Sequence, residues 1–156
     1  MPQFRTTRLV SHTPAAMFDL VADVEKYPTF VPLCTGLKVR RRAAGEGGVE
    51  ILTADMDVGY RALREKFTSR ATLDRANLKI HSTYVDGPFS RMDNRWDFAP
   101  EPGSPEKCRV EFFIDYAFRS RTFTLLMGSL FDTAFRKFAG AFEARADAVY
   151  GRRGAP

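Results

Sequence analysis

The sequence predicts an α+β fold in which a curved antiparallel sheet of about seven strands wraps around a long C-terminal helix. Three observations predict this fold. Between Gly36 and Phe118 the chain consists of short β-prone segments separated by turn residues. Residues 122–150 read as one helix with a single apolar stripe. Near the N-terminus, Thr13 and Pro14 introduce one short helix after the first strand.

Length and composition are those of one globular domain. Of 156 residues, 44% are hydrophobic and 28% are charged, which argues against a disordered chain and against a membrane bundle. A chain of this length buries enough surface to fold without disulfides, and it contains only Cys34 and Cys108. We expect a single domain over residues 1–156, with its core at about 3–151, and two buried, reduced thiols.

No segment has the features of a membrane anchor or of an export signal. The longest uncharged stretch, Tyr27 to Leu37, has eleven residues and contains two prolines, whereas a membrane-spanning helix needs about 20 apolar residues. Residues 1–10 lack the apolar core of a signal peptide. We therefore expect a cytoplasmic protein, compatible with peripheral contact at the inner membrane.

The N-terminal part is predicted to form a strand followed by a short helix. Residues 4–10 are β-prone. Thr13 is a favourable N-cap, Pro14 fits the first helical position, and apolar residues then recur at helical spacing. Pro28 is predicted to end this helix, and residues 27–33 to form an elbow or a second short helix.

Further strands follow, joined by short turns. They are predicted over residues 39–42, 49–58, 61–73, 78–85, 92–98 and 108–118. Asp86-Gly87-Pro88 is the strongest turn signal, and residues 100–105 are predicted to be a surface loop. Every second residue of the last strand is apolar, which predicts one face turned to the core. Because consecutive strands with short connections pair, we expect an antiparallel meander.

The C-terminal helix carries much of the apolar surface. Residues 122–150 have one broad apolar stripe, and Gly151 is a plausible stop. Five of the 14 phenylalanines lie on this helix, namely Phe123, Phe131, Phe135, Phe138 and Phe142. Such a helix buries its stripe across the concave face of the sheet, which is a helix-grip arrangement. A curved sheet closed by a single helix leaves a space between them, and ligands bind there.

Three segments resemble a known family. They are Met17 to Cys34, Asp86-Gly87-Pro88-Phe89 with Trp96-Asp97-Phe98, and Ala141 to Ala146 with Tyr150-Gly151. Over residues 3–151 the chain resembles the coenzyme Q-binding protein family of START-like domains. This branch lies within the polyketide cyclase/dehydrase-like superfamily and also holds the bacterial ribosome-association toxins.

The resemblance implies a START-like helix-grip fold and a small carrier or chaperone that is not an enzyme. Family members of the respiratory type bind ubiquinone in the cavity and support its delivery to the respiratory chain. Toxin-type relatives bind the large ribosomal subunit and block subunit joining. No residue motif in the sequence separates the two types, so both functions stay open.

The candidate ligand site lies between the sheet and the last helix. Its ten candidate residues, seven from strands and three from the helix, are Leu52, Met56, Phe67, Met92, Trp96, Phe112, Ile114, Phe131, Phe135 and Phe138. An isoprenoid tail requires an apolar lining of this kind, although packing alone would also produce it. Asn94, Tyr116 and Arg64 are candidate donors to the quinone oxygens.

A basic cluster is the candidate surface for anionic partners. The net charge is +5, and Lys38, Arg40, Arg41 and Arg42 lie together beside a glycine-rich turn. Acidic lipid or ribosomal RNA would attract these cations, and a solvated strand end is the simpler interpretation. No aromatic residues are interleaved with them, so a base-stacking platform and a DNA partner are not predicted.

The sequence offers little support for catalysis. It contains two histidines, His12 and His81, far apart in the chain, and no metal-binding, nucleophile or phosphate-binding motif. Asp55 and Asp57 share one strand face, which we expect to be the solvated outer face. We therefore expect no catalytic residues, no metal and no cofactor, with ubiquinone as a bound ligand only.

Three functions remain from this reasoning. The first is a ubiquinone carrier that uses the cavity, and the second is a ribosome-binding inhibitor of translation that uses the basic exterior. The third is a cyclase-like or dehydratase-like enzyme. It would need polar groups that converge inside the cavity, and the strand alternation does not predict them.

Overall fold

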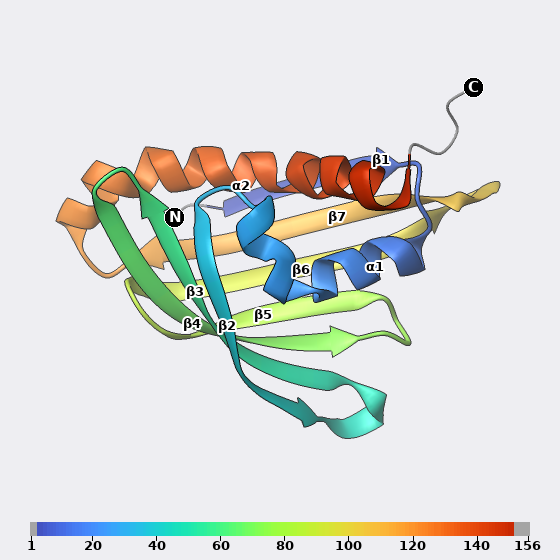
Figure 1. Ribbon diagram of the computed structural model, residues 1–156, viewed down its shortest axis with the longest axis horizontal. Helices are drawn as coiled ribbons and strands as arrows, with labels where there is room; N and C mark the ends of the chain where they lie inside the picture. Colours follow the sequence, from blue (N-terminus) through green and yellow to red (C-terminus); the bar gives the residue numbers. More distant parts are fainter. Residues whose placement is uncertain (1–2, 152–156) are drawn as a thin grey trace.

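A computed structural model describes residues 3–151, and Figure 1 shows the arrangement of its elements. In chain order these are β1 (Gln3–Val10), α1 (Pro14–Ala22), the 3-10 helix η1 (Val24–Thr29), β2 (Cys34–Ala44), the 3-10 turn η2 (Glu46–Gly48), β3 (Glu50–Tyr60), β4 (Leu63–Asp74), β5 (Lys79–Asp86), β6 (Phe89–Glu101), β7 (Ser104–Phe118) and α2 (Arg121–Tyr150). Residues 1–2 and 152–156 of the expected domain lie outside the described range.

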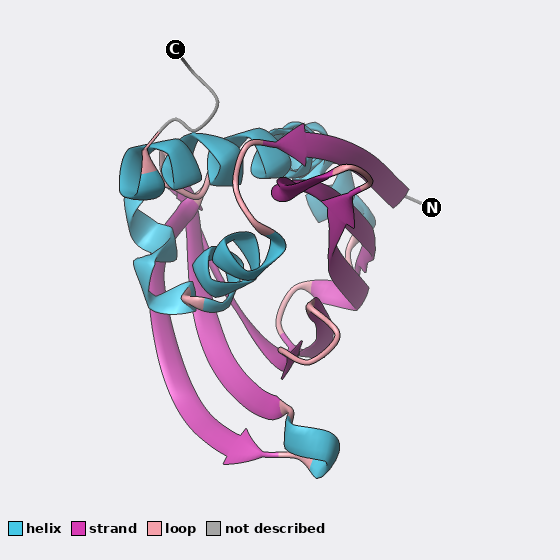
Figure 2. Cartoon of the chain, turned by 90° about the vertical axis from the view of Figure 1, so that its right-hand side faces the viewer, coloured by secondary structure: helices cyan, strands magenta, loops and turns pink. Residues whose placement is uncertain are grey.

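The strands form one antiparallel sheet of seven strands in the order β1-β7-β6-β5-β4-β3-β2. The sheet curves into a cup, α2 lies across its concave side, and α1 and η1 lie on the same side (Figures 1 and 2). Consecutive strands from β2 to β7 pair with each other, and β1 is added beside β7. The α+β class and the START-like helix-grip fold are thereby confirmed.

Local sequence explains both helix starts. The Thr13 hydroxyl accepts a hydrogen bond from the Ala16 amide, and Pro14 occupies the first turn of α1. At α2, the Ser120 hydroxyl accepts from the Phe123 amide. Gly151 then ends α2 with φ +83°, a conformation that glycine adopts without strain.

Two predicted boundaries are wrong. Helix α1 ends at Ala22, and Pro28 lies inside η1, because the chain turns at Asp23 before the proline is reached. Most of the predicted loop at residues 100–105 is strand, since β6 runs to Glu101 and β7 starts at Ser104. Pro100 is tolerated in β6 because the pairing register shifts next to it.

Asp55, Asp57 and Asp93 lie on the convex face of the sheet, the first two as expected. Asp55 accepts a hydrogen bond from the Thr68 hydroxyl at 2.6 Å, and Asp57 faces Lys66 at 3.8 Å. Asp93 lies between His81 at 2.6 Å and Arg95 at 3.2 Å. Asp57 is therefore a member of a surface ion pair, and Asp55 also faces a cation, Arg40, at 3.7 Å.

The turn between β5 and β6 requires glycine at position 87. Gly87 has φ +141°, and a Cβ atom there would lie 2.6 Å from Cβ of Phe67. Phe67 is buried and packs edge-on against Phe89, with ring centroids 5.4 Å apart. The glycine therefore lets this turn lie directly against a residue of the core.

Replacing Gly87 with alanine should lower the free energy of unfolding by about 1–3 kcal/mol, since both the backbone conformation and the contact with Phe67 become strained. Urea denaturation measures this loss. Gly103→Ala is the matched control, because Gly103 also has positive φ but no atom within 4 Å of the added Cβ. A Gly87→Ala variant no less stable than Gly103→Ala would contradict this explanation of the turn.

Candidate functional site

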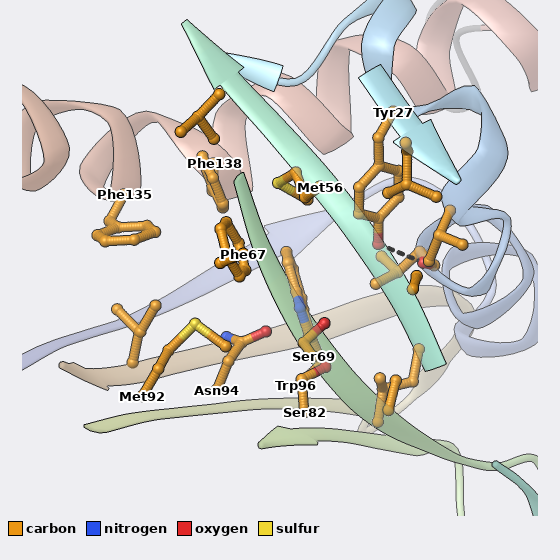
Figure 3. A pocket seen from close by; sticks show the side chains of 18 of the residues that line it. Tyr27, Met56, Phe67, Ser69, Ser82, Met92, Asn94, Trp96, Phe135 and Phe138 are labelled. Carbon is orange, nitrogen blue, oxygen red and sulfur yellow. Dashed lines mark hydrogen bonds between the residues drawn. The ribbon is translucent and has the colours of Figure 1, made fainter. Parts of the chain in front are cut away.

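An apolar cavity of about 100 Å³ lies between the sheet and α2 (Figure 3). Strands β2 to β7, α1, η1 and α2 all contribute side chains. Its lining consists of Val21, Val24, Tyr27, Pro32, Leu33, Leu37, Leu52, Ala54, Met56, Val58, Phe67, Ser69, Ala71, Leu73, Ile80, Ser82, Met92, Asn94, Trp96, Ile114, Phe131, Ala134, Phe135, Phe138 and Phe142. None of these side chains is charged, so the cavity suits an uncharged molecule or part of one.

Nine of the ten predicted ligand residues line this cavity. They are Leu52, Met56, Phe67, Met92, Trp96, Ile114, Phe131, Phe135 and Phe138. Phe112 does not line it. Phe112 is 1% exposed and is enclosed by Phe4, Trp96 and Phe138, with ring centroids 4.7 to 6.2 Å away. Alternation placed Phe112 on the correct face of β7, but neighbouring rings cover it.

Of the three predicted polar contacts, the structure places only Asn94 at the cavity. The Arg64 guanidinium is exposed and donates to the backbone carbonyls of Arg61 and Leu63 at the β3–β4 turn. Tyr116 is buried in the core against Phe135, with ring centroids 4.9 Å apart. Arg64 was misplaced because it follows the turn so closely that its side chain folds back on it.

Sequence reasoning missed two polar residues of the cavity, Ser69 on β4 and Ser82 on β5. Figure 3 shows both near Asn94. A serine on a strand normally reads as a solvent-facing residue. The alternation of side chains along the strand could have identified Ser69, because Ser69 lies on the same strand face as Phe67 and Ala71.

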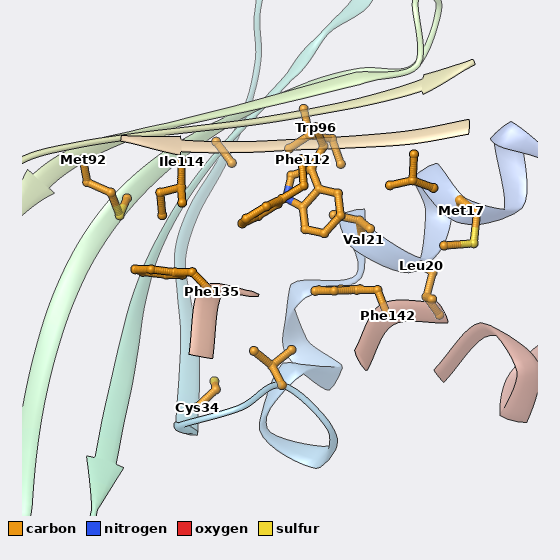
Figure 4. Packing of buried hydrophobic residues seen from close by; sticks show 14 of the residues in the cluster. Met17, Leu20, Val21, Cys34, Met92, Trp96, Phe112, Ile114, Phe135 and Phe142 are labelled. Carbon is orange, nitrogen blue, oxygen red and sulfur yellow. The ribbon is translucent and has the colours of Figure 1, made fainter. Parts of the chain in front are cut away.

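Tyr27 of η1 lines the cavity near α1, and Phe30, the residue that follows η1, packs beside it. The Tyr27 hydroxyl donates to the Val21 carbonyl (dashed in Figure 3), and burial raises the pKa of Tyr27. Tyr27 and Phe30 both pack edge-on against Phe142 of α2, at 5.3 and 5.0 Å between centroids. Phe142 also meets Trp96 at 4.9 Å, so one ring joins α2, η1 and the sheet (Figure 4).

The loop after η1 is strained where it meets the cavity. Leu33 lines the cavity and has φ +68°, in the left-handed region that β-carbon-bearing residues rarely adopt. Its carbonyl accepts from the Gly59 amide at 3.0 Å, which ties this loop to the end of β3. Strained residues of this kind concentrate at binding sites.

Both cysteines are free and buried, as predicted. Burial raises the pKa of Cys34 to about 11 and the pKa of Cys108 to about 12. The two thiols therefore stay protonated at neutral pH, and neither has the lowered pKa of a nucleophilic cysteine.

Alkaline conditions should destabilise the fold through these thiols. Unfolded cysteines lose their protons near pH 8.5, whereas the folded thiols keep theirs up to about pH 11 and 12. The unfolded state thus binds fewer protons above pH 8.5, so the free energy of unfolding falls as the pH rises. Urea denaturation between pH 7.5 and 10 should show this fall. The double variant Cys34→Ala/Cys108→Ala should show a weaker dependence of the free energy of unfolding on pH. An equally steep fall in that variant would show that the two thiols do not cause it.

The basic cluster is divided by a β-bulge in β2. The pairing of β2 with β3 shifts between Val39 and Arg41. Arg40 then faces Asp55 at 3.7 Å, while Arg42 bonds Glu25 and Glu50, both at 3.1 Å. Lys38 and Arg41 are exposed and have no ion pair with any residue from 3 to 151. The four cations therefore do not form one continuous basic patch, because Arg40 and Arg42 are paired with carboxylates and Lys38 and Arg41 are not.

Residues 3–151 contain no cluster of three or more metal-ligating side chains that could hold an ion. Over the same residues, no helix is both long and apolar enough to cross a bilayer.

The fold and the cavity define a START-like helix-grip domain with an internal apolar site. Residues 10–143 match the family described as polyketide cyclase/dehydrase and lipid transport. The chain belongs to this family, which confirms the superfamily indicated by the sequence.

Curated relatives carry two kinds of name. The ribosome association toxin RatA of Escherichia coli (strain K12) is 36% identical over 98% of this chain and 92% of its own length. The mitochondrial coenzyme Q-binding protein COQ10 homolog B of Xenopus laevis is 27% identical over 99% of this chain and 62% of its own length. Both are named as binding or toxin proteins.

Solved structures agree on the fold. The solution structure of an 18 kDa protein from Caulobacter crescentus is 37% identical with a TM-score of 0.76, covering 97% of this chain and 99% of that one. An aromatase/cyclase from Streptomyces sp. R1128 has a TM-score of 0.77 at 15% identity, covering 99% of both chains. At that identity the likeness shows the fold alone.

Proposed function

We propose that the protein binds a hydrophobic ligand, ubiquinone, between the sheet and α2 and acts as a carrier in support of respiratory electron transport. The observation that carries this proposal is the uncharged cavity, lined by nine of the ten residues predicted from the sequence. Similarity to a coenzyme Q-binding protein supports the choice of ligand. Burial of the isoprenoid tail supplies the affinity, at roughly 25 cal/mol per Å² of apolar surface before ordering costs.

Binding requires the cavity to widen. Its volume of about 100 Å³ is below the roughly 300–1,000 Å³ typical of small-molecule sites. Helix α2 packs mainly on β7, β1 and α1, and residues of β2 to β5 line the cavity together with residues of α2. The cavity can therefore widen on the side of α2 that faces these strands. We propose that the ligand enters between α2 and these strands.

The carrier is proposed to work without catalysis and without a cofactor. The polar side chains at the cavity are the neutral groups of Tyr27, Ser69, Ser82, Asn94 and Trp96. A general acid or base near neutral pH is best supplied by histidine or a shifted carboxyl group. Histidine and carboxyl groups do not occur among the lining residues of the described chain.

Delivery is proposed to take place at the inner membrane, with the protein otherwise in the cytoplasm. Lys38 and Arg41 are the contact residues, because their side chains are exposed and make no ion pair with residues 3–151. Near anionic lipid each such cation contributes about 1 kcal/mol.

Bound lipid is the direct test of the carrier proposal. The protein is purified from cells that make ubiquinone and extracted with organic solvent, and the extract is analysed by mass spectrometry. Near-stoichiometric ubiquinone is the expected result. An extract of the folded protein that contains other lipids but no ubiquinone would contradict the choice of ligand.

Ribosome association is the second candidate, and the similarity to toxins of that name favours it. In this case Lys38 and Arg41 would contact ribosomal RNA. Replacing both with alanine should weaken sedimentation with ribosomal subunits and lower the slope of log K against log salt by about two. Arg121→Ala/Lys137→Ala removes the same charge from exposed sites on α2. Equal losses in both variants would contradict a specific contact at β2.

A further inference from the structure

The uncharged cavity contains a small polar cluster. We use this term for Ser69, Ser82 and Asn94, which lie on three adjacent strands, β4, β5 and β6. Figure 3 shows their side chains on the cavity side of the sheet, with Phe135 and Phe138 of α2 across the space. The other lining residues are apolar apart from Trp96 and Tyr27, and the Tyr27 hydroxyl already donates to the Val21 carbonyl.

Strand register explains why the cluster is compact. Ser82 and Asn94 are directly paired across β5 and β6. Ser69 lies two positions before Ala71, the residue paired with Ser82 on β4, and so is its diagonal neighbour. Direct cross-strand neighbours are about 5 Å apart and diagonal ones about 7–8 Å. Ser69 and Asn94 are two strands apart, so a ring that carries oxygens at separate positions can contact the cluster at more than one of its side chains.

The cluster has unused hydrogen-bonding capacity. The Asn94 amide nitrogen donates to the Phe113 carbonyl at 2.9 Å. Because a carbonyl only accepts, this bond fixes the orientation of the amide and leaves the Asn94 side-chain oxygen free of it. Within residues 3–151, the hydroxyls of Ser69 and Ser82 make no hydrogen bond to another side chain or to the backbone. Buried polar groups normally form hydrogen bonds. The two serine hydroxyls and the Asn94 side-chain oxygen are therefore available to bind polar atoms of a ligand.

The indole N–H of Trp96 is also available for a hydrogen bond. Trp96 is 4% exposed and lines the cavity beside Asn94. Its N–H makes no hydrogen bond within the described part of the chain. The cavity thus offers hydroxyl and N–H donors together with one amide acceptor, and no formal charge.

We infer that Ser69, Ser82 and Asn94 bind the oxygen-bearing end of the ligand, and that the ligand is a neutral molecule with carbonyl or hydroxyl groups on a compact ring. This inference rests on the proposed function and specifies its ligand class. A hydrocarbon would leave the cluster unpaired, and a carboxylate or phosphate would be buried without a counter-ion. The apolar remainder of the lining receives the hydrocarbon part.

Two probes and paired variants test the inference. Ubiquinone-1 carries ring oxygens, whereas farnesene is an isoprenoid hydrocarbon without oxygen. Trp96 is the single tryptophan of the chain and lies in the cavity, so its fluorescence reports binding of both. Ser69→Ala/Ser82→Ala removes two hydroxyls with little change in volume. Ser90→Ala is the matched control, since Ser90 is exposed and bonds the Ala117 carbonyl outside the cavity.

The double variant should bind ubiquinone-1 about tenfold more weakly and farnesene with unchanged affinity. Ser90→Ala should bind both probes like the unaltered protein, and Asn94→Leu should repeat the selective loss. Equal effects of Ser69→Ala/Ser82→Ala on the two probes, or none on either, would overturn the inference while the carrier proposal stands. If the unaltered protein bound neither probe, the result would contradict both the inference about the polar cluster and the carrier proposal.

Discussion

Replacing Phe142 with alanine should lower the free energy of unfolding by about 3–5 kcal/mol, the cost of removing a fully buried phenylalanine. Phe142 is 1% exposed and its ring contacts Trp96, Tyr27 and Phe30. These contacts join the sheet, η1 and α2, so their loss loosens all three elements together. Urea denaturation followed by circular dichroism measures the effect.

The control for this variant lies on the same helix. Leu125 is 86% exposed, and Leu125→Ala should change stability by no more than about 0.5 kcal/mol. The two substitutions together separate packing from helix propensity, because both introduce alanine into α2. A loss below about 1 kcal/mol for Phe142→Ala would mean that α2 is not held to the sheet through this residue.

Filling the cavity should abolish retention of the ligand. Ala71 lines the cavity from β4 and is 6% exposed, and a phenylalanine at this position would occupy space beside the polar cluster. Overpacking costs about 1–3 kcal/mol in a dense core, and less where space already exists. Ala71→Phe should therefore fold, yet carry less than a tenth of the lipid found in the unaltered protein by mass spectrometry.

An exposed alanine on the sheet provides the comparison. Ala99 on β6 faces solvent, so Ala99→Phe adds the same ring without entering the cavity. It should retain the ligand fully. If Ala71→Phe folded and still retained as much lipid as Ala99→Phe, the binding site would have to lie elsewhere.

The sequence was sufficient to predict the inward face of β7 but not the contacts within that face. Alternation along β7 correctly turned Phe112 and Ile114 inward, and only Ile114 lines the cavity. Which inward ring meets the open space depends on packing by Phe4 of β1 and Phe138 of α2. Contacts with residues so distant in the sequence cannot be predicted from the alternation of apolar residues along one strand.

Irregular backbone limited the prediction of the surface. Four consecutive or nearly consecutive cations suggested one patch, but the bulge in β2 changes the direction of the side chains after Val39. Arg42 thereby reaches Glu25 on η1, far from it in the sequence. Neither the bulge nor this partner can be predicted from a pattern of charges.

Methionine methyl NMR tests most directly whether the cavity binds the ligand. Met56 and Met92 line the cavity, whereas Met17 is buried in the core without lining it and Met127 is half-buried on α2. Addition of ubiquinone-1 to protein labelled with carbon-13 at the methionine methyls should shift the signals of Met56 and Met92 saturably and leave that of Met17 in place. Unchanged Met56 and Met92 signals, or shifts confined to Met127, would contradict binding between the sheet and α2.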